Sequence, residues 1–404
     1  MYQLLLLAMV WRVGMEHTRR RNQPTRKIVT LKSALDKSDY HEALRDHGGR
    51  IVKHLPLVNA LVCEFPSSRG RPVTALHEHP EVLDVEEDFQ VQILDVDPPG
   101  DAWPHNTLAG RWRWRRTGPQ PPQQIGWNIE RIHAPEAWAT SQGQNVKIGV
   151  IDTGIDLNHP DLKENIAGSV NMISPNRDGN DDNGHGTHVA GVLAALNNEI
   201  GVVGVAPQAS LYAVKAIDFR GVGKVSDIIE GIDWCTKNGI ELVNLSFGSR
   251  RNSRALKRAV EAAHQAGIIM VAAAGNSPDE PVTYPARYPE VVAVSAITPE
   301  DSLARFSSRG PEVTLTAPGQ DIRSTYLYGG YKTLSGTSMA APHVTGTAAL
   351  VLAAGTTADE VRRRLLATAQ PLPELKPGED GHGLVDALAA VNTLELPAAG
   401  RGVS

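Results

Sequence analysis

Short apolar runs alternate with longer amphipathic segments from Ile125 to the end of the chain. Five runs rich in β-branched residues or alanine predict buried strands: Val146–Ile151, Ser210–Lys215, Glu241–Ser246, Ile268–Ala273 and Val291–Ala296. The segments with helical periodicity are His185–Leu196, Val225–Lys237, Ser253–Gln265, Thr337–Ala354 and, last, Thr357–Thr368, and Val385–Val391 closes the domain. This alternation predicts an α/β domain with a mainly parallel sheet and helices on both faces. Functional residues are then expected at the carboxyl ends of the strands.

Residues 27–94 carry a different pattern, that of a small α+β unit. Strands are expected at Lys27–Leu31, Arg50–Leu55, Val58–Phe65, Val82–Val85 and Phe89–Leu94, with helices at Ser33–His47 and Pro72–Glu78. The order β-α-β-β-α-β is that of a ferredoxin-like domain. The predicted plan is a leader (1–26), this small unit (27–94), a linker (95–122), a large domain (123–395) and a tail (396–404).

Composition narrows the function classes only a little. The chain has 404 residues, 41% of them apolar, which is enough for two domains with a large core. A formal net charge of −5 argues against a nucleic-acid-binding protein. The two cysteines, Cys63 and Cys235, fall in different predicted domains, so no disulfide framework is expected.

Two N-terminal segments leave alternatives open. Leu4–Val10 is apolar but too short to span a bilayer, so no stable membrane insertion is expected. It has the length of a signal-peptide core, yet no Lys or Arg precedes it, and a disordered start is the other interpretation. The run Arg111–Arg116 interleaves Arg with Trp and would suit an anionic surface, but the Pro- and Gly-rich surroundings favour an exposed, cleavable linker.

Three segments carry the candidate chemistry. Asp152 ends an apolar strand before a Gly turn; His185 begins a helix between glycines; Ser338 lies in the first turn of another helix. Helix N-termini favour a developing anion. A hydroxyl needs a neighbouring base to act as a nucleophile, and the base needs an orienting group. Ser338, His185 and Asp152 would fill these three roles, whereas His188, one helical turn later, is expected to be structural.

A fourth segment, 272–276, follows an apolar strand and reads AAAGN. The amide of Asn276 would donate to an oxyanion together with the backbone N–H of Ser338, although an Asn after Gly is also common in turns. Taken together, the four segments resemble the subtilisin family of serine proteases, over about residues 123–391. The resemblance implies an Asp152-His185-Ser338 triad, an oxyanion donor at Asn276, and hydrolysis of peptide bonds through an acyl-enzyme.

The resemblance also implies a substrate cleft. Leu245–Gly248 and Gly221–Gly223 resemble the two backbone segments between which an extended peptide pairs. Ala273, Ala274 and Gly275, with Thr283–Pro285, would line an uncharged primary pocket, which implies broad specificity with an apolar P1 residue. Asp279 and Glu280 lie near its rim, where basic P1 residues are the alternative. The substrate-binding set implied is Gly221, Gly223, Ser246, Phe247, Gly248, Ala274 and Gly275.

Calcium is the cofactor that the resemblance implies. Segment 196–202 resembles the family's calcium loop, with backbone oxygens of Leu196, Ile200 and Val202 and the side chain of Asn198 as hard oxygen ligands. Gln123 and Asp161 match the remaining ligands. Asp178, Asp181 and Asp182 form an acidic cluster before His185; a further calcium site is one interpretation and a solvated acidic turn the other.

The small N-terminal unit resembles the family's inhibitory propeptide, mainly through Glu78–Asp88 and its position. The resemblance therefore implies a self-processing precursor that its own propeptide inhibits, with polypeptides as the other partners, no nucleic acid, and a monomer. Secretion is expected, with the cytoplasm as the alternative. Three rival interpretations are an inactive pseudoprotease, a kexin-like processing enzyme and an intracellular subtilisin. No triad residue is missing, and the cysteine and extra domain expected of kexins are absent.

Overall fold

The computed structural model describes residues 24–33, 49–66, 76–96, 119–376 and 378–393. Contacts divide the chain into two units. The N-terminal unit comprises residues 1–89 together with 253–258, and the C-terminal unit comprises 90–252 and 259–404. The segments Leu4–Val10 and Arg111–Arg116 and the tail 396–404 lie outside the described residues.

The N-terminal unit contains a four-stranded antiparallel sheet in the order β2-β3-β1-β4. Its strands are β1 (Thr25–Leu31), β2 (Arg50–Leu55), β3 (Ala60–Phe65) and β4 (Val82–Glu87), with a 3-10 turn at Pro56–Val58. This strand order is the one that a ferredoxin-like unit requires. The region of the expected helix within Ser33–His47 and the start of Pro72–Glu78 lie outside the described residues, so the full β-α-β-β-α-β arrangement stays a prediction.

One face of this small sheet makes a compact core. Val29, Leu61, Phe65 and Val85 are buried together, and Cys63 packs among them. Within the same unit the Glu86 carboxylate accepts hydrogen bonds from the backbone N–H groups of Arg254 and Ala255, 2.9 and 3.1 Å away. A carboxylate at the first free N–H groups of a helix stabilises that helix end.

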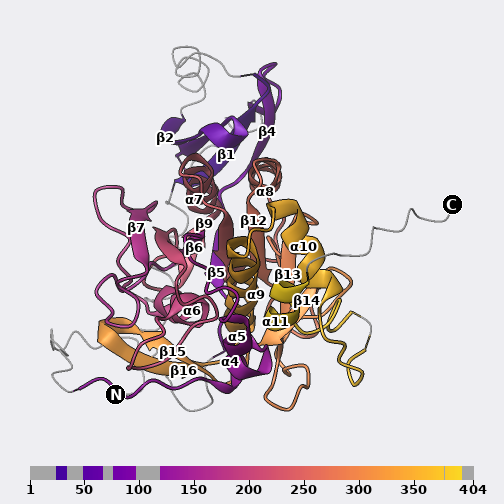
Figure 1. Ribbon diagram of the computed structural model, residues 1–404. Helices are drawn as coiled ribbons and strands as arrows, with labels where there is room; N and C mark the ends of the chain where they lie inside the picture. The colour runs from indigo at the N-terminus through magenta and orange to yellow at the C-terminus, as the bar shows by residue number, and fades with distance from the viewer. Residues whose placement is uncertain (1–23, 34–48, 67–75, 97–118, 377, 394–404) are drawn as a thin grey trace, which may run out of the picture. The chain divides into compact units, whose positions relative to one another are not determined.

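A seven-stranded parallel sheet forms the centre of the C-terminal unit in the described part of the chain (Figure 1). The order is β14-β13-β12-β10-β6-β8-β7, with every described pairing parallel. The strands are β6 (Lys147–Asp152), β7 (Ile166–Asn171), β8 (Ser210–Lys215), β10 (Leu242–Leu245), β12 (Ile269–Ala273), β13 (Val291–Ile297) and β14 (Leu315–Pro318). The predicted mainly parallel α/β fold is thereby confirmed.

Helices pack on both faces of this sheet because side chains alternate along each strand. Ile148 and Val150 of β6 belong to the large core that also contains residues of α6 (His185–Ala194) and α9 (Thr337–Ala353). Gly149 and Ile151 point the other way: a Cβ at position 149 would touch Cys235 of α7 (Val225–Lys237), and one at Gly231 would touch Ile151. Cys63 and Cys235 are both buried free thiols. Burial raises the pKa of each thiol and so disfavours the thiolate, which is the reactive form of cysteine.

Further elements in the described residues are five helices and a β-hairpin. The helices are α4 (Trp127–Arg131), α5 (Ala134–Ala137), α8 (Arg254–Gln265), α10 (Ala358–Ala367) and α11 (Ala387–Asn392). The hairpin of β15 (Ile322–Tyr326) and β16 (Gly330–Leu334) closes through a 3-10 turn, Leu327–Gly329. No helix in the described residues is long and apolar enough to cross a membrane.

The C-terminal unit also contains a three-stranded sheet, which includes parts of the two segments expected to bind the substrate. Strand β5 (Gln90–Ile93) lies between β9 (Val222–Lys224) and β11 (Phe247–Gly248) and pairs antiparallel with both. The sequence analysis expected a strand at Phe89–Leu94, and the structure pairs it with segments more than a hundred residues further along the chain.

Candidate active site

Asp152 and His185 face each other across the carboxyl edge of the sheet. Asp152 is the last residue of β6, and His185 is the first residue of α6. His185 Nδ1 lies 2.8 Å from Asp152 Oδ1, and both side chains are almost fully buried. The Asp152 carboxylate accepts a hydrogen bond from Nδ1–H of His185, and Nε2 is then the unprotonated, basic nitrogen of the ring. Nε2 has no hydrogen-bond partner in the described residues, so it is available to a substrate or a nucleophile.

The charges around His185 oppose the effect of burial. Burial alone would lower the pKa of His185, but the carboxylates of Asp152, Asp95 and Asp181 outweigh it and hold that pKa above its usual value. His188 differs, because burial lowers its pKa to about 3. Its Nε2 donates to the backbone oxygens of Ile322 and Lys332, 3.0 and 3.1 Å away. His188 is therefore a neutral, structural histidine.

Ser338 occupies the second position of α9, directly after Gly336 and Thr337. Its hydroxyl donates to the backbone oxygen of Ser246 at 2.9 Å and accepts from the backbone N–H of Leu94 at 3.1 Å. The hydroxyl is thus turned toward Ser246, and no hydrogen bond joins it to His185 Nε2 in this structure. Rotation about the Cα–Cβ bond moves a serine hydroxyl between such partners.

The Leu94 carbonyl oxygen accepts one hydrogen bond beside Ser338, and the amide of Asn276 lies nearby. The backbone N–H of Ser338 donates to the Leu94 oxygen at 3.3 Å. Asn276 follows β12, and its Oδ1 accepts from the N–H and the hydroxyl of Thr337, which fixes the amide orientation. Asn276 Nδ2 then has no partner among the described residues. A Cβ at Gly336 would lie 2.5 Å from the Leu94 oxygen and 3.1 Å from this Nδ2, so only glycine leaves this space open.

The chain's own segment 90–94 lies in the cleft as an extended strand. Val91 and Gln92 pair with Gly223 and Val222 of β9, and Ile93 pairs with Phe247 of β11. Gly221 has a φ of +76°, a left-handed conformation that favours glycine, and a Cβ there would lie 2.8 Å from Ile93 Cδ1. Past Leu94 the pairing continues, since the N–H of Val96 donates to the Ser335 oxygen at 2.7 Å.

The segments that the sequence analysis expected to line the primary pocket lie close together beside the Leu94 side chain. A Cβ at Gly248 would lie 3.0 Å from Leu94 Cδ1, so the Leu94 side chain lies against β11. The Ala274 oxygen accepts from the N–H of Thr283 at 2.8 Å, which joins the two segments expected to line the pocket. Gly275 has a φ of +127°, a left-handed conformation that favours glycine. On the rim, the carboxylate of Glu280 forms an ion pair with Arg250.

The six residues expected to bind calcium, which are four residues of segment 196–202 together with Gln123 and Asp161, also lie close together. Asp161 is buried; its oxygens accept from Asn198 Nδ2 at 2.9 Å, the N–H of Val202 at 3.0 Å and the Tyr331 hydroxyl at 3.2 Å. All three partners are neutral, and burial raises the pKa of Asp161 to about 6. The amide of Gln123 lies 2.9 Å from the oxygen of Leu196 and 3.5 Å from that of Val202.

This arrangement fits a hard cation. Two backbone oxygens point at one spot, and the nearby buried carboxylate lacks a cationic partner among its described contacts. Rotation of the Gln123 and Asn198 amides exchanges their nitrogen and oxygen atoms and would turn further oxygens inward. Ile200, whose N–H donates to Asn198 Oδ1 at 2.7 Å, holds the loop closed.

The acidic cluster before His185 is used differently. Asp181 accepts hydrogen bonds from the backbone N–H groups of Asn183, Gly184 and Thr187 and from the Thr187 hydroxyl. Asp182 pairs with Lys215, and exposed Asp178 accepts from the N–H of Asn180. In the described residues no three His, Cys, Asp or Glu side chains gather as a metal site. Through these hydrogen bonds and the ion pair, the acids organise the loop that leads to His185.

Comparison with known proteins decides the family. Residues 143–387 match the subtilase family. Subtilisin DY of Bacillus licheniformis is 45% identical over 278 residues, which cover 66% of this chain and 99% of that protein. A thermostable alkaline protease of Halalkalibacterium halodurans is 46% identical over 268 residues, covering 66% and 73%. Subtilisin E of Bacillus subtilis is 39% identical over 348 residues, covering 83% and 82%.

The chain belongs to the subtilase family. It is a subtilisin-like serine endopeptidase, as the sequence resemblance implied. Some residues of this subtilase site were not singled out as functional by sequence reasoning. They are Thr337, which orients Asn276; Ser335, which pairs with Val96; Tyr331, which contacts Asp161; Asp95, which acts on His185; and Lys215. Only Lys215 has a clear sequence signal, because a charge at the end of the apolar run Ser210–Lys215 demands a buried partner.

Proposed function

We propose that Asp152, His185 and Ser338 are the catalytic triad of this endopeptidase. The observation that carries the proposal is the position of the Leu94 carbonyl: its oxygen accepts from the Ser338 N–H and lies near Asn276 Nδ2, which has no partner among the described residues. His185 Nε2 accepts the proton of the Ser338 hydroxyl once that hydroxyl turns from Ser246. Oγ attacks the carbonyl carbon, and Asp152 stabilises the imidazolium that forms.

The reaction then proceeds through an acyl-enzyme. Negative charge on the former carbonyl oxygen is stabilised by the Ser338 N–H and Asn276 Nδ2, whose orientation Thr337 has already fixed. His185 gives its proton to the leaving amine as the C–N bond breaks. Water, deprotonated by the same imidazole, then hydrolyses the ester at Ser338.

The cleft supports an extended polypeptide substrate with an apolar P1 residue. Main-chain pairing with β9 and β11 gives affinity without regard to sequence, and the pockets give the selectivity. Leu94 in the first pocket and fully buried Val91 three residues before it are both apolar. The Arg250 partner of Glu280 weakens the case for basic P1 residues.

We further propose that the chain is a precursor that cuts itself between Leu94 and Asp95. Its support is the uncut segment 90–96, which runs through the cleft with the Leu94 carbonyl beside Ser338. After the cut, residues up to Leu94 would stay bound as an inhibitor, because the tail already has the bound conformation. Degradation of the propeptide then gives full activity.

Calcium is proposed as a structural cofactor, held by Gln123, Asp161, Leu196, Asn198, Ile200 and Val202. A bound calcium ion supplies positive charge to the buried Asp161 carboxylate and stabilises the loop. Because the loop also binds segment 121–124 through the N–H groups of Gln123, Gln124 and Gly201, the ion would secure the start of the catalytic domain.

Mass spectrometry of the purified chain tests the function. The parent should yield fragments that begin at Asp95, whereas Ser338→Ala should remain a single uncut chain. Ser302→Ala is the matched control, because Ser302 is exposed and only its backbone oxygen is engaged. Processing in Ser338→Ala at the parent rate would contradict the triad assignment.

A further inference from the structure

Lys215 is a buried cation that the triad chemistry leaves without a role. It is the last residue of β8, and in the parallel register it lies beside Asp152 of β6. Its side chain is only 6% exposed. Burying an ammonium is costly unless its protons are all bound, so its partners show what it does there.

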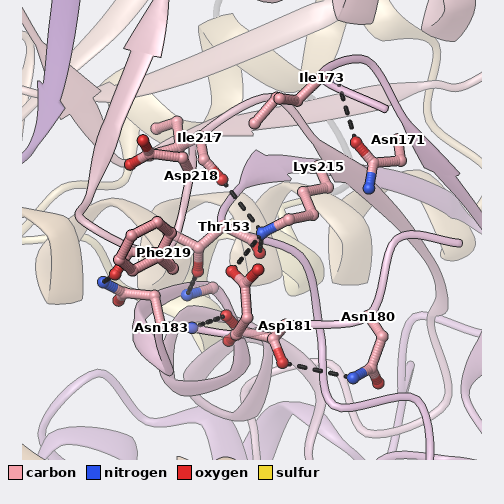
Figure 2. Close-up of polar contacts among 12 residues, drawn as sticks. Thr153, Asn171, Ile173, Asn180, Asp181, Asn183, Lys215, Ile217, Asp218 and Phe219 are labelled. Atoms are coloured by element: carbon pink, nitrogen blue, oxygen red, sulfur yellow. Dashed lines mark hydrogen bonds and ion pairs between the residues drawn. The ribbon is translucent and has the colours of Figure 1, made fainter. Parts of the chain in front are cut away.

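Three acceptors take the three ammonium protons of Lys215 (Figure 2). Nζ donates to the Thr153 oxygen at 2.6 Å, to Asp182 Oδ1 at 2.6 Å and to the Ile217 oxygen at 3.2 Å. An ammonium has three donors and no acceptor, so its hydrogen-bonding capacity is filled.

The first acceptor belongs to the turn that fixes Asp152. The Thr153 N–H donates to Asp152 Oδ1 at 2.7 Å, the same oxygen that contacts His185. The Thr153 hydroxyl accepts from the N–H of Gly186, the residue after His185, at 2.9 Å. A shift of Thr153 therefore moves the carboxylate and the start of helix α6 together.

The second acceptor belongs to the loop that fixes His185. Asp182 follows Asp181, whose carboxylate takes four hydrogen bonds at the start of α6. In Figure 2 the Lys215 side chain points from β8 toward this loop. The third acceptor, the backbone oxygen of Ile217, belongs to the segment that leads into β9 at the substrate cleft. The N–H of Ile217 donates to the backbone oxygen of Asp152 at 3.1 Å.

We propose that Lys215 is a positioning residue: its ammonium ties the turn after Asp152 to the loop before His185 and so sets the Asp152–His185 contact. This inference rests on the proposed function of those two residues. Lys215 touches no reacting atom. It acts because Asp152 ends strand β6 and His185 begins helix α6, so their contact depends on how these two elements are held together. Small displacements of catalytic groups lower the rate markedly.

Two measurements on Lys215→Met test the proposal. The variant should lower kcat on a soluble peptide by about 10- to 100-fold with KM nearly unchanged. Rates are referred to active sites counted with a covalent serine-directed reagent, so that misfolded molecules do not contribute. In the uncut Ser338→Ala chain, the far-downfield proton signal of His185 Nδ1–H should broaden or move when Lys215→Met is added.

Lys237→Met is the matched control. Lys237 also forms a 2.6 Å ion pair, with Asp233 on α7, but its side chain is 59% exposed. It should keep the parent kcat and the parent proton signal. If Lys215→Met lowers only the melting temperature, with kcat per active site and the downfield signal unchanged, Lys215 is merely structural and the proposal is wrong.

Asp182→Ala keeps the proposal testable if Lys215→Met does not fold. The Asp182 side chain is 53% exposed, so water can take the place of its carboxylate at the buried Lys215 ammonium. It should lower kcat about tenfold, the size expected for losing a charged hydrogen bond, and Asp182→Asn should restore part of the loss. An unchanged kcat and downfield signal in Asp182→Ala would overturn the link to the His185 loop. Activity surviving in Ser338→Ala would instead refute the proposed triad, a separate result.

Discussion

The backbone of Leu94 forms two hydrogen bonds with Ser338: its N–H lies 3.1 Å from Oγ, and its oxygen lies 3.3 Å from the Ser338 N–H. The same carbonyl therefore lies next to both the proposed nucleophile and a proposed oxyanion donor, as a susceptible peptide bond would. The peptide bond after it, between Leu94 and Asp95, is the first bond that the enzyme would meet.

Removing the nucleophile should arrest the chain as an uncut precursor. Ser338→Ala should lower the rate of peptide hydrolysis by about 10⁶-fold, a magnitude established for subtilisin rather than derived from this structure. The check is turnover of a chromogenic peptide together with intact mass. More than a few per cent of the parent activity in Ser338→Ala would rule out this serine as the nucleophile.

Asn276→Ala removes the second oxyanion donor. Loss of Nδ2, which has no other partner in the described residues, should lower kcat by about 10²- to 10³-fold, again the size known for subtilisin. Loss of Oδ1, which accepts two hydrogen bonds from Thr337, should lower the melting temperature as well. KM should change little, because the donor acts mainly in the transition state. A loss confined to KM, measured with the same peptide, would mean that Asn276 binds substrate instead.

The first cut should fall after Leu94. N-terminal sequencing of the first large product should read Asp95-Val96-Asp97, and Leu94→Glu should slow this cut because the pocket lining is uncharged. Gln92→Glu is the control: it adds the same charge in β5, at a residue that is exposed, and should keep the cut site. A first product that begins beyond Arg111 would show that the linker, rather than Leu94, occupies the cleft during processing.

Sequence patterns predicted the central strands β6, β8, β10, β12 and β13 because each is a largely apolar run. They missed β7, β14 and the β15–β16 hairpin, whose short strands mix small and polar residues with apolar ones. The pattern also identified a strand near Phe89–Leu94, but strand patterning alone does not give its partners, β9 and β11. Strand propensity does not encode pairing over such sequence separations.

The residues of the candidate site could also be identified from the sequence, whereas their contacts could not. Asp152, His185, Asn276 and Ser338 were identifiable because each is a reactive or polar residue in a distinctive Gly-rich or helix-start setting. The direction of the Ser338 hydroxyl toward Ser246 was not, since a rotamer depends on neighbours far apart in sequence. The three acceptors of Lys215 were hidden for the same reason: they lie in three separate segments.

Calcium should stabilise the catalytic domain through Asp161. Selective binding to the folded state at a hundredfold excess over Kd is worth about 2.7 kcal/mol, so a chelator should lower the melting temperature and speed autolysis. The pKa of Asp161 is raised to about 6, above its unfolded value, so the metal-free protein loses stability as pH rises through that range. The stabilisation by calcium should therefore grow between about pH 4 and pH 6, and calorimetry with and without chelator measures it.

Asp161→Ala should abolish most of that response. Asp178→Ala is the control, because Asp178 is an exposed acid of the cluster before His185 and lies outside the calcium loop. An unchanged melting curve in excess chelator would refute the calcium proposal. A response lost in Asp178→Ala but kept in Asp161→Ala would move the ion to the acidic cluster.

The residue after the expected cut, Asp95, should make self-processing sensitive to acid. Burial lowers the pKa of His185, but the carboxylates of Asp152, Asp95 and Asp181 raise it to a net higher value. A base must be neutral to accept the Ser338 proton, so a raised pKa weakens catalysis at low pH. Asp95→Asn removes one of the three charges. It should lower the pKa of His185 in the precursor and move the acid limb of the first cut to lower pH, as followed by mass spectrometry over time.

The effect of Asp95 should be confined to the first cut. Once the Leu94–Asp95 bond is broken and Asp95 has left the cleft, only Asp152 and Asp181 still face His185. Hydrolysis of an added peptide by the mature enzyme should therefore have the same acid limb in the parent and in Asp95→Asn. Asp95→Glu keeps the charge and should keep the parent profile for both reactions. If Asp95→Asn shifts neither profile, the Asp95 carboxylate does not act on His185; if it shifts both equally, Asp95 remains beside His185 after cleavage.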